Sequence, residues 1–288
     1  MAHPSTSSHN ALAFYRERIA DDGKPRPWTL ADLEAFAAAN PGDRYAGRVS
    51  SEARPKLSMQ IEATAEPPIW MALDSGELDK WAAVLSRIYA RWGCATGECI
   101  AFFEYGSSPL VILSSSGYVG YLKRGAAERL GINAICNDGV AAMAPRMATI
   151  VESVKPAMIV LRRDVIAPFC SAIEMAGVSL KGRARWVAVC DVDGALDRDE
   201  TQRLASTLGV EVYRILRADA AFLLAGECPD CRLFHIDAAY NVEQVSNGEI
   251  AITTRFAKTC PAIRYNIGAA KLERGGCAKA PREWRVEL

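Results

Sequence analysis

Between residues 99 and 218, short apolar runs alternate with segments of helical pattern, and this alternation limits the possible folds more than any other feature. The runs IAFFEY, INAIC, AMIVL, WVAVC and VEVYRIL have the length and the near-continuous apolar character of strands buried on both faces. Helical patterns lie between them, near residues 120–130, 146–154, 164–176 and 197–208. Such alternation is typical of a mostly parallel sheet flanked by helices. The sequence therefore predicts the α/β class.

The pattern changes after residue 220, where the helical segments stop. The stretches FLLAG, LFHI, NVEQV, EIAITT and AIRYN predict a C-terminal antiparallel β-meander. We therefore expect three parts in the chain. Residues 1–9 are expected to be disordered, residues 10–220 to form a helical N-terminal part and the α/β core, and residues 221–288 to form the β-meander with a cluster of cysteines and one histidine.

Two helix starts are signalled ahead of the alternating region. Thr29 and Asp32 have the spacing of a capping box and open the segment LADLEAFAAA. Asp74 or Ser75 begins a longer segment whose apolar residues recur at helical spacing. Residues 40–68 are polar and poorly patterned, so loops with one strand are expected there.

Charge and composition exclude some classes of partner. The chain has 34 basic and 34 acidic residues, so no net charge favours nucleic acid or an anionic membrane. No apolar run approaches the roughly 20 residues that span a bilayer, and the polar start MAHPSTSSHN lacks the apolar core of a signal peptide. We expect a cytoplasmic protein whose nine cysteines stay reduced.

Several segments carry a family resemblance. The chain contains, in order, AFYRERI, EYG at Glu104–Gly106, GAAERLGINAI, and GEIAITT followed by PAIRYNIG. Their order and spacing resemble the N-terminal domain of phenylacetate–CoA ligases, within the adenylate-forming superfamily, from about Phe14 to Cys277. The resemblance implies a ligase-type domain in which the tyrosine and glycine of EYG border an aryl pocket.

The residues that this family uses for ATP are replaced here. IEATAEPP, residues 61–68, stands where the family has a Ser/Thr/Gly-rich phosphate loop, and it has no glycine, whereas phosphate binding depends on backbone N–H groups at close range. Ala220 lies near the position of the magnesium-holding glutamate, with Asp219 one residue away as a shifted alternative, and Ala269 replaces the ribose-binding aspartate. The chain ends at Leu288, about where the family's mobile C-terminal domain begins, so we expect that domain to be lacking. We expect no ATP binding and no acyl adenylate from this chain alone.

The cysteine and histidine cluster points to a structural zinc, because several members of the resembled family hold one with such residues. The resemblance places Cys228 and His235 in the first part of that site and Cys277 at the first cysteine of a later CxC, whose second cysteine is Lys279 here. Cys231, at C-x-x-C spacing from Cys228, would supply a fourth donor and complete a closed tetrahedral site. The alternative is that zinc was lost together with ATP binding.

A domain of this type without ATP chemistry would still offer an aryl pocket and a route for a pantetheine arm. We therefore interpret the chain as an ATP-independent acyltransferase that passes the acyl group of an acyl- or aryl-CoA thioester to the thiol of an acyl carrier protein. Positioning and oxyanion stabilisation would supply the rate. Cys136 is the candidate nucleophile, with a purely structural role as its alternative. Tyr105 is a candidate oxyanion donor, and Tyr105, Gly106, Tyr118 and Tyr121 are candidate substrate-binding residues.

Two other functions stay open. The first is a non-catalytic pseudo-ligase that acts as a ligand-binding or scaffold subunit. The second is an aryl-CoA ligase subunit whose missing loop and lid come from a partner. The expected partners are an acyl carrier protein or another enzyme of the same pathway, and a homodimer is also expected because related folds commonly dimerise.

Overall fold

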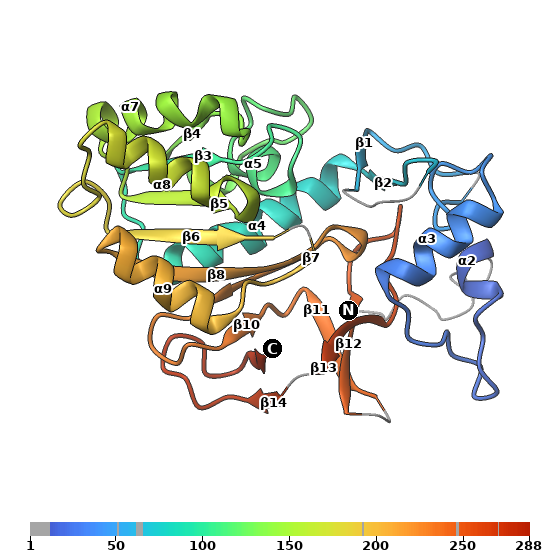
Figure 1. Ribbon diagram of the computed structural model, residues 1–288. Coiled ribbons are helices and arrows are strands. Elements are labelled where there is room, and N and C mark those ends of the chain that lie inside the picture. The colour runs from blue at the N-terminus through green and yellow to red at the C-terminus, as the bar shows by residue number, and fades with distance from the viewer. Residues whose placement is uncertain (1–11, 51, 62–65, 192, 246–247, 270) are drawn as a thin grey trace.

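The structure is a computed structural model that describes residues 12–50, 52–61, 66–191, 193–245, 248–269 and 271–288. The segment predicted to be disordered, residues 1–9, lies outside these ranges. Within them, a ten-stranded mixed sheet forms the centre of the molecule (Figure 1). None of the described helices combines the length and the apolarity that crossing a membrane would require.

One half of this sheet is parallel, as the alternating pattern predicts. Its strands are β3 (Cys99–Phe103), β4 (Asn133–Cys136), β5 (Met158–Arg162), β6 (Trp186–Cys190) and β8 (Glu211–Ala218). β3 pairs with β4 and β5, β5 with β6, and β6 with β8, all in parallel. Every residue of β5 and β6 is buried, because helices cover both faces of the sheet, and this explains why these strands are apolar except for Arg162 at the end of β5.

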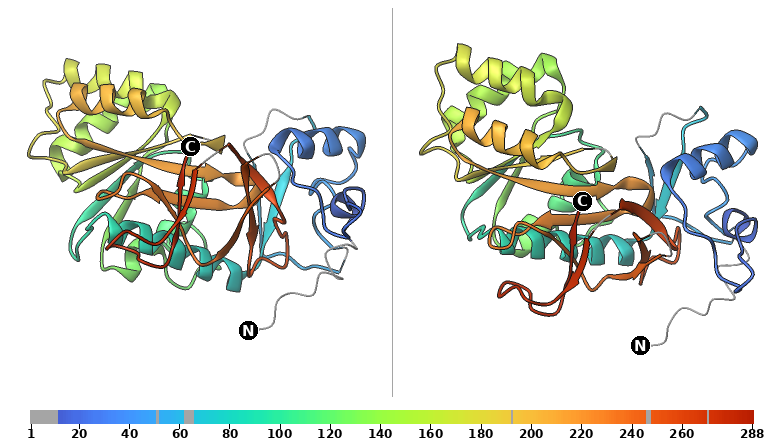
Figure 2. Two further views of the ribbon diagram at one scale, coloured as in Figure 1. Left: turned by 90° about the horizontal axis from the view of Figure 1, so that it is seen from below. Right: turned by 60° about the horizontal axis from the view of Figure 1, so that its bottom comes forward.

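Two sets of helices cover the two faces. Figure 2 shows α4 on one side of the sheet and α7, α8 and α9 on the other. Successive residues of β3 alternate between the two cores, with Phe102 beside α4 and Phe103 beside α7 and α8. The first set is α4 (Ser75–Arg91), α5 (Pro109–Ser114) and α6 (Ala126–Arg129); the second is α7 (Ala144–Val154), α8 (Ile166–Met175) and α9 (Arg198–Leu208), with the 3₁₀ turns η1 (Ala141–Met143) and η2 (Arg163–Val165) before α7 and α8.

The antiparallel strands predicted after residue 220 are confirmed and are divided between two sheets, and two further strands, over 271–274 and 284–287, were not predicted. β9 (Leu223–Glu227), β10 (Phe234–Ile236), β15 (Trp284–Glu287) and β14 (Lys271–Arg274) continue the central sheet beyond β8, while β7 (Asp193–Gly194) pairs with the end of β8. β11 (Tyr240–Gln244), β12 (Glu249–Thr254) and β13 (Tyr265–Ala269) form a separate sheet. The chain passes from β8 to β9 through the 3₁₀ turn η3 (Asp219–Ala221) and Phe222, whose φ is 51°. The proposed domain division at residue 220 stays a prediction.

The N-terminal part contains α2 (Ala13–Arg16), α3 (Leu30–Ala39), and a hairpin of β1 (Leu57–Gln60) and β2 (Trp70–Leu73). Thr29 and Asp32 form the predicted capping box of α3. Asp74 caps α4 as predicted and also forms a capping box. The residues just before Asp74 are extended: Trp70 to Leu73 form β2 and pair with β1 before α4 starts.

Candidate functional site

The carboxyl ends of the parallel strands hold a buried group of ionic side chains. Glu104 directly follows β3, Arg217 lies near the end of β8, and Asp219 follows β8. The Arg217 guanidinium donates to both carboxylate oxygens of Asp219, at 2.6 and 2.7 Å, and from Nη1 to Glu104 Oε2 at 3.1 Å. Cys190, the last residue of β6, has its Sγ 3.1 Å from Glu104 Oε2. All four side chains are buried.

The charges of this group stabilise one another. Burial acts to lower the pKa of Arg217, but the carboxylates of Asp219 and Glu104 outweigh it and raise the pKa well above its ordinary value. Burial, together with the charge of Glu104, raises the pKa of Cys190 well above its ordinary value, so its thiol stays protonated. Open α/β sheets bind ligands in the crevice outside the carboxyl ends of their strands. Here, internal ion pairs occupy part of that edge.

Tyr105, a predicted catalytic and substrate-binding residue, lies beside this group. Its hydroxyl accepts a hydrogen bond from Arg162 Nη2 at 2.8 Å, and the Arg162 guanidinium lies 3.7 Å from the centre of the Tyr105 ring. Arg162 ends β5 and also pairs with Asp164, Nε to Oδ1, at 2.6 Å. Because Arg162 donates to the hydroxyl oxygen, the Tyr105 O–H can still act as a donor, as a predicted oxyanion donor must.

Cys136, the predicted nucleophile, ends β4 next to Tyr105. Its Sγ lies 3.8 Å from the backbone oxygen of Glu104. Burial raises the pKa of Cys136 to about 11, and the carboxylates of Asp138 and Glu104 act in the same direction. A thiolate nucleophile requires the opposite environment, with a base or a positive charge nearby. Gly106 is exposed and faces the Asp138 carboxylate from the neighbouring loop.

Tyr118 and Tyr121, the other predicted substrate-binding residues, lie at the surface, with 39% and 52% of each residue exposed. The Tyr118 hydroxyl accepts from Cys136 N at 2.9 Å and donates to Ala134 O at 3.3 Å. It therefore bonds to the backbone of β4 at the edge of the sheet. Burial is the main cause that raises the pKa of Tyr118.

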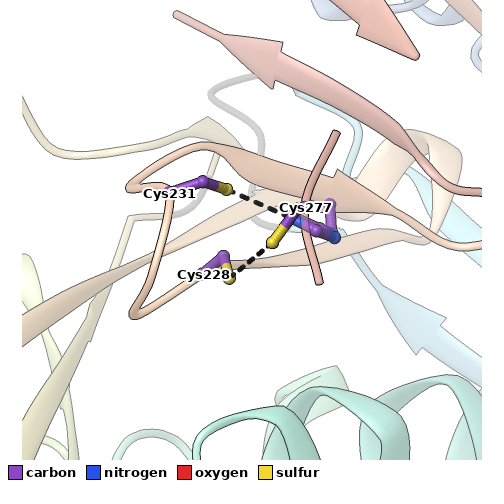
Figure 3. A group of neighbouring side chains, drawn as sticks. Cys228, Cys231 and Cys277 are labelled. Carbon is purple, nitrogen blue, oxygen red and sulfur yellow. Dashed lines mark hydrogen bonds between the residues drawn. The ribbon is translucent and has the colours of Figure 1, made fainter. Parts of the chain in front are cut away.

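The four predicted metal ligands come together in space. Cys228 follows β9, Cys231 lies in the next turn, His235 belongs to β10, and Cys277 lies between β14 and β15. Their donor atoms all lie within 4.8 Å of one another. The Cys228 and Cys277 sulfurs are 3.7 Å apart, and Cys231 Sγ is 3.2 Å from His235 Nε2. Figure 3 shows the three thiols turned toward a common centre.

The backbone and the surrounding side chains shape this cluster. Cys228 N–H donates to Leu233 O and Arg232 N–H donates to Cys228 O, both at 2.9 Å, which closes the turn that brings Cys231 back toward Cys228. Burial raises the pKa of Cys228 to about 11. Burial also opposes ionisation of Cys277, yet backbone N–H groups and the neighbouring thiols lower its pKa below the ordinary value.

A carboxylate stands behind the histidine of the cluster. Glu283 Oε2 lies 3.3 Å from His235 Nδ1, although the pair is not aligned as a hydrogen bond, and accepts from Arg91 Nη2 at 2.6 Å. Trp92 Nε1 donates to the carbonyl of Glu227, just before Cys228, at 2.7 Å. A carboxylate on the far nitrogen commonly orients a metal-binding histidine. Three thiols and one imidazole converge here, and all but the half-buried Cys231 are buried, so they fit a tetrahedral zinc ion.

Sequence reasoning missed Arg217 and Glu283. Arg217 lies at the end of the apolar run of β8, and Asp219 follows two positions later. This spacing indicates a local ion pair and could have been used to find it. Glu283 gives no such signal, because its partners Arg91 and His235 are distant in the sequence.

Only some of the residues that replace the family's ATP-binding groups lie in the described part of the structure. Residues 62–65 of the expected phosphate loop, and the side chain of Ala269, lie outside the described part of the structure. Ala220 is buried in η3, and its carbonyl accepts from Arg48 Nη1. Asp219, the shifted alternative to the magnesium-holding glutamate, is bound by both Nε and Nη2 of Arg217.

The mixed sheet, with helices on both faces of its parallel half and the added antiparallel strands, is the fold of the adenylate-forming CoA ligases, which confirms the resemblance at the level of the fold. The solved structures that resemble this chain include 2-hydroxyisobutyryl-CoA ligase in an open conformation with 2-HIB-AMP and CoA. The TM-score is 0.76 and the sequence identity 15%, over 98% of this chain and 70% of that chain.

Two further structures agree with this assignment. The same ligase in its thioesterification state gives a TM-score of 0.77 and 14% identity, over 97% of this chain and 63% of that chain. An acyl-CoA synthetase from Brucella canis gives a TM-score of 0.51 and 14% identity, over 80% of this chain and 44% of that chain. No protein-family model and no curated protein matches the sequence.

Proposed function

We propose that this chain is a pseudo-ligase: a ligand-binding subunit with the fold of a CoA ligase that does not form acyl adenylates. The observation that carries the proposal is the buried group of Glu104, Arg217 and Asp219 at the carboxyl ends of the strands. These charges neutralise one another inside the protein. A carboxylate held by both Nε and Nη2 of Arg217 is poorly placed to bind magnesium.

Zinc is part of this proposal, in a structural role. Cys228, Cys231, His235 and Cys277 would hold the ion, with Glu283 orienting the imidazole. Four protein ligands leave no open position for water, so the ion would stabilise the fold rather than take part in a reaction. It would join the turn after β9 to the segment between β14 and β15.

Acyl transfer from a CoA thioester is the second candidate, and the contact of Tyr105 with Arg162 favours it. The thiolate of a carrier protein would attack the thioester carbonyl, and Tyr105 O–H would stabilise the oxyanion. The coenzyme A thiolate would then leave, with the acyl group on the carrier. Cys136, whose Sγ lies 3.8 Å from the backbone oxygen of Glu104, is the candidate intermediate acceptor, but its raised pKa opposes this role. An acyl carrier protein or a second copy of the chain would be the partner.

Two assays separate the candidates. In the first, the protein is incubated with ATP, magnesium and a panel of carboxylic acids, and released pyrophosphate is measured. A pseudo-ligase should release no pyrophosphate. Release above the level of a control without protein would refute the proposal. In the second, phenylacetyl-CoA and a holo carrier protein are mixed without ATP, and the mass of the carrier is followed. An increase by one acyl group supports the transferase, and its loss in Tyr105→Phe would assign the oxyanion donor.

A further inference from the structure

The cluster of Cys228, Cys231, His235 and Cys277 holds its sulfur atoms close enough to react with one another. Cys228 Sγ and Cys277 Sγ are 3.7 Å apart, and the donor atoms of all four residues lie within 4.8 Å of one another. All nine cysteines lie in the described ranges, and this cluster is the one place where the structure records a contact between two thiols. A disulfide holds its sulfurs about 2.05 Å apart. The sulfurs therefore need to move by only a few ångströms to form one.

Cys231 is the accessible member of this cluster. Cys228, His235 and Cys277 are buried, whereas Cys231 is half-buried. It lies in the turn between β9 and β10, directly after the exposed Asp230. Figure 3 shows its sulfur directed from that turn toward Cys277. A small reagent that arrives from solvent therefore meets Cys231 first and finds two further thiols behind it.

The other half-buried thiols of the chain are in a different chemical state. Burial raises the pKa of all four of them, Cys94, Cys99, Cys136 and Cys170. The structure records no sulfur–sulfur contact for any of these four. A cysteine that binds zinc is instead held as a thiolate, and the thiolate is the form that peroxides oxidise. Exposure and chemical state therefore both favour oxidation at Cys231.

We propose that the cluster is a site of reversible oxidation by hydrogen peroxide. The Cys231 sulfur attacks one oxygen of the peroxide, the O–O bond breaks, and Cys231 becomes a sulfenic acid while hydroxide leaves. The thiolate of Cys228 or Cys277 then attacks the Cys231 sulfur, so that an S–S bond forms and a second hydroxide leaves. Two thiolates and one peroxide thus give one disulfide and two hydroxides, and the peroxide is the species that is reduced.

This oxidation removes two of the four zinc ligands. The remaining thiol and His235 no longer close a tetrahedral site, so zinc should leave. The link between the turn after β9 and the segment between β14 and β15 is then lost or is replaced by the disulfide. The inference rests on the zinc part of the proposed function and adds a means by which that site is regulated.

The full chain, loaded with zinc and freed of excess metal, tests the proposal at pH 7.5. Hydrogen peroxide should release zinc, followed with a zinc-sensitive dye, in step with a mass loss of two hydrogens per disulfide, and peptide mapping should find Cys231 in the disulfide. Cys99 should react at least about 10-fold more slowly, because a thiol with a raised pKa is only a few per cent thiolate at this pH. Dithiothreitol with added zinc should restore the original mass and metal content.

Three results would overturn the proposal. The first is zinc that stays bound at peroxide concentrations that oxidise Cys99. The second is zinc release in which the cluster cysteines gain oxygen atoms and form no disulfide. The third is release that dithiothreitol and added zinc do not reverse. All three are read on the unchanged protein, so they require no variant to fold.

Variants assign the reacting thiol. Cys99→Ser is the matched control: its side chain is half-buried like that of Cys231 but lies outside the cluster, so zinc release should proceed at an unchanged rate. Cys231→Ser removes a metal ligand, so it is compared with the unchanged protein after both are freed of zinc, with thermal unfolding as a check that both are folded. A disulfide should form several-fold more slowly in this variant, because the accessible thiol is gone. Equal rates would place the first oxidation on another thiol and refute the role of Cys231.

The failure of this inference can be told apart from the failure of the proposed function. Zinc that binds and resists peroxide would refute the oxidation site and leave the structural zinc standing. A chain that binds no zinc would refute both. Pyrophosphate release from ATP, with zinc release by peroxide intact, would refute the pseudo-ligase alone.

Discussion

Replacing Arg217 by methionine should strongly destabilise the protein. The guanidinium is 1% exposed and makes three hydrogen bonds, at 2.6, 2.7 and 3.1 Å, to the carboxylates of Asp219 and Glu104. Without it, two buried carboxylates face each other with no cation between them. Removing one partner of a buried ion pair costs about 3–5 kcal/mol. In a protein of this size, that loss corresponds to a fall in Tm of about 10 °C.

Chemical denaturation at pH 8 and pH 5 measures this effect and tests its cause. In Arg217→Met the folded protein can relieve the repulsion by binding a proton, so its stability relative to the original protein should improve as the pH falls from 8 to 5. The double variant Glu104→Gln with Arg217→Met should recover part of the loss, because one uncompensated charge is gone. Arg163→Met is the control: its side chain is 52% exposed in its pairs with Asp191 and Glu200, so its loss should stay below about 1 kcal/mol.

A loss below about 1 kcal/mol in Arg217→Met, with no dependence on pH, would refute this reasoning. It would mean that water reaches the carboxyl ends of the strands and that the ion pairs do not occupy them. The pseudo-ligase proposal would then lose the observation on which it depends.

Three further predictions concern other parts of the fold. The purified protein should contain zinc, measured by metal analysis under competition with a chelator. Cys231→Ser should lose the zinc, and Glu283→Gln should bind it about 10- to 100-fold more weakly. Cys99→Ser is the control and should retain the zinc. Burial opposes ionisation of Glu128, but hydrogen bonds from Gly125 N–H and two serines hold its pKa below the ordinary 4.5. The stability that this carboxylate provides is therefore present above pH 4.5 and is lost as the pH falls through the lower pKa of the folded protein. Glu128→Gln should cost about 1 kcal/mol at pH 7 and less at pH 3 in urea titrations. In Gly226→Ala the new Cβ would lie 2.5 Å from a methyl group on α4, so unfolding experiments should show a loss of about 1–3 kcal/mol.

The order of strands and helices in the parallel half could be predicted because most of these elements have a recognisable pattern in their own residues. The five apolar runs coincide with β3, β4, β5, β6 and β8, and the capping box at Asp74 marks the start of α4. The six-residue helix α5, PLVILS, was not predicted, because all six residues are buried and five of them are apolar, so the segment has no polar face. Length and periodicity give no signal in such a segment.

The division of the later strands between two sheets could not be predicted in the same way. β14 (KLER) and β15 (WRVE) carry charged residues and show no apolar strand pattern. For all of the later strands, the choice of neighbour depends on contacts distant in the sequence. The pairing of β10 with β15, for example, joins His235 to Arg285. The four predicted metal ligands lie together in the structure; three of them are close in the sequence, and the resemblance supplied Cys277. Glu283 was not predicted to belong to this group, because its position depends on its ion pair with Arg91 in α4.

The hydroxyl of Tyr118 has a consequence for how this protein meets other chains. An outermost strand usually offers its unpaired peptide groups to any extended segment that comes alongside. In β4, one phenol satisfies both the Cys136 N–H and the Ala134 carbonyl, and so substitutes for a neighbouring strand. A chain that joins the sheet at this border would first have to displace that side chain, so Tyr118 makes the addition of a strand beside β4 less favourable.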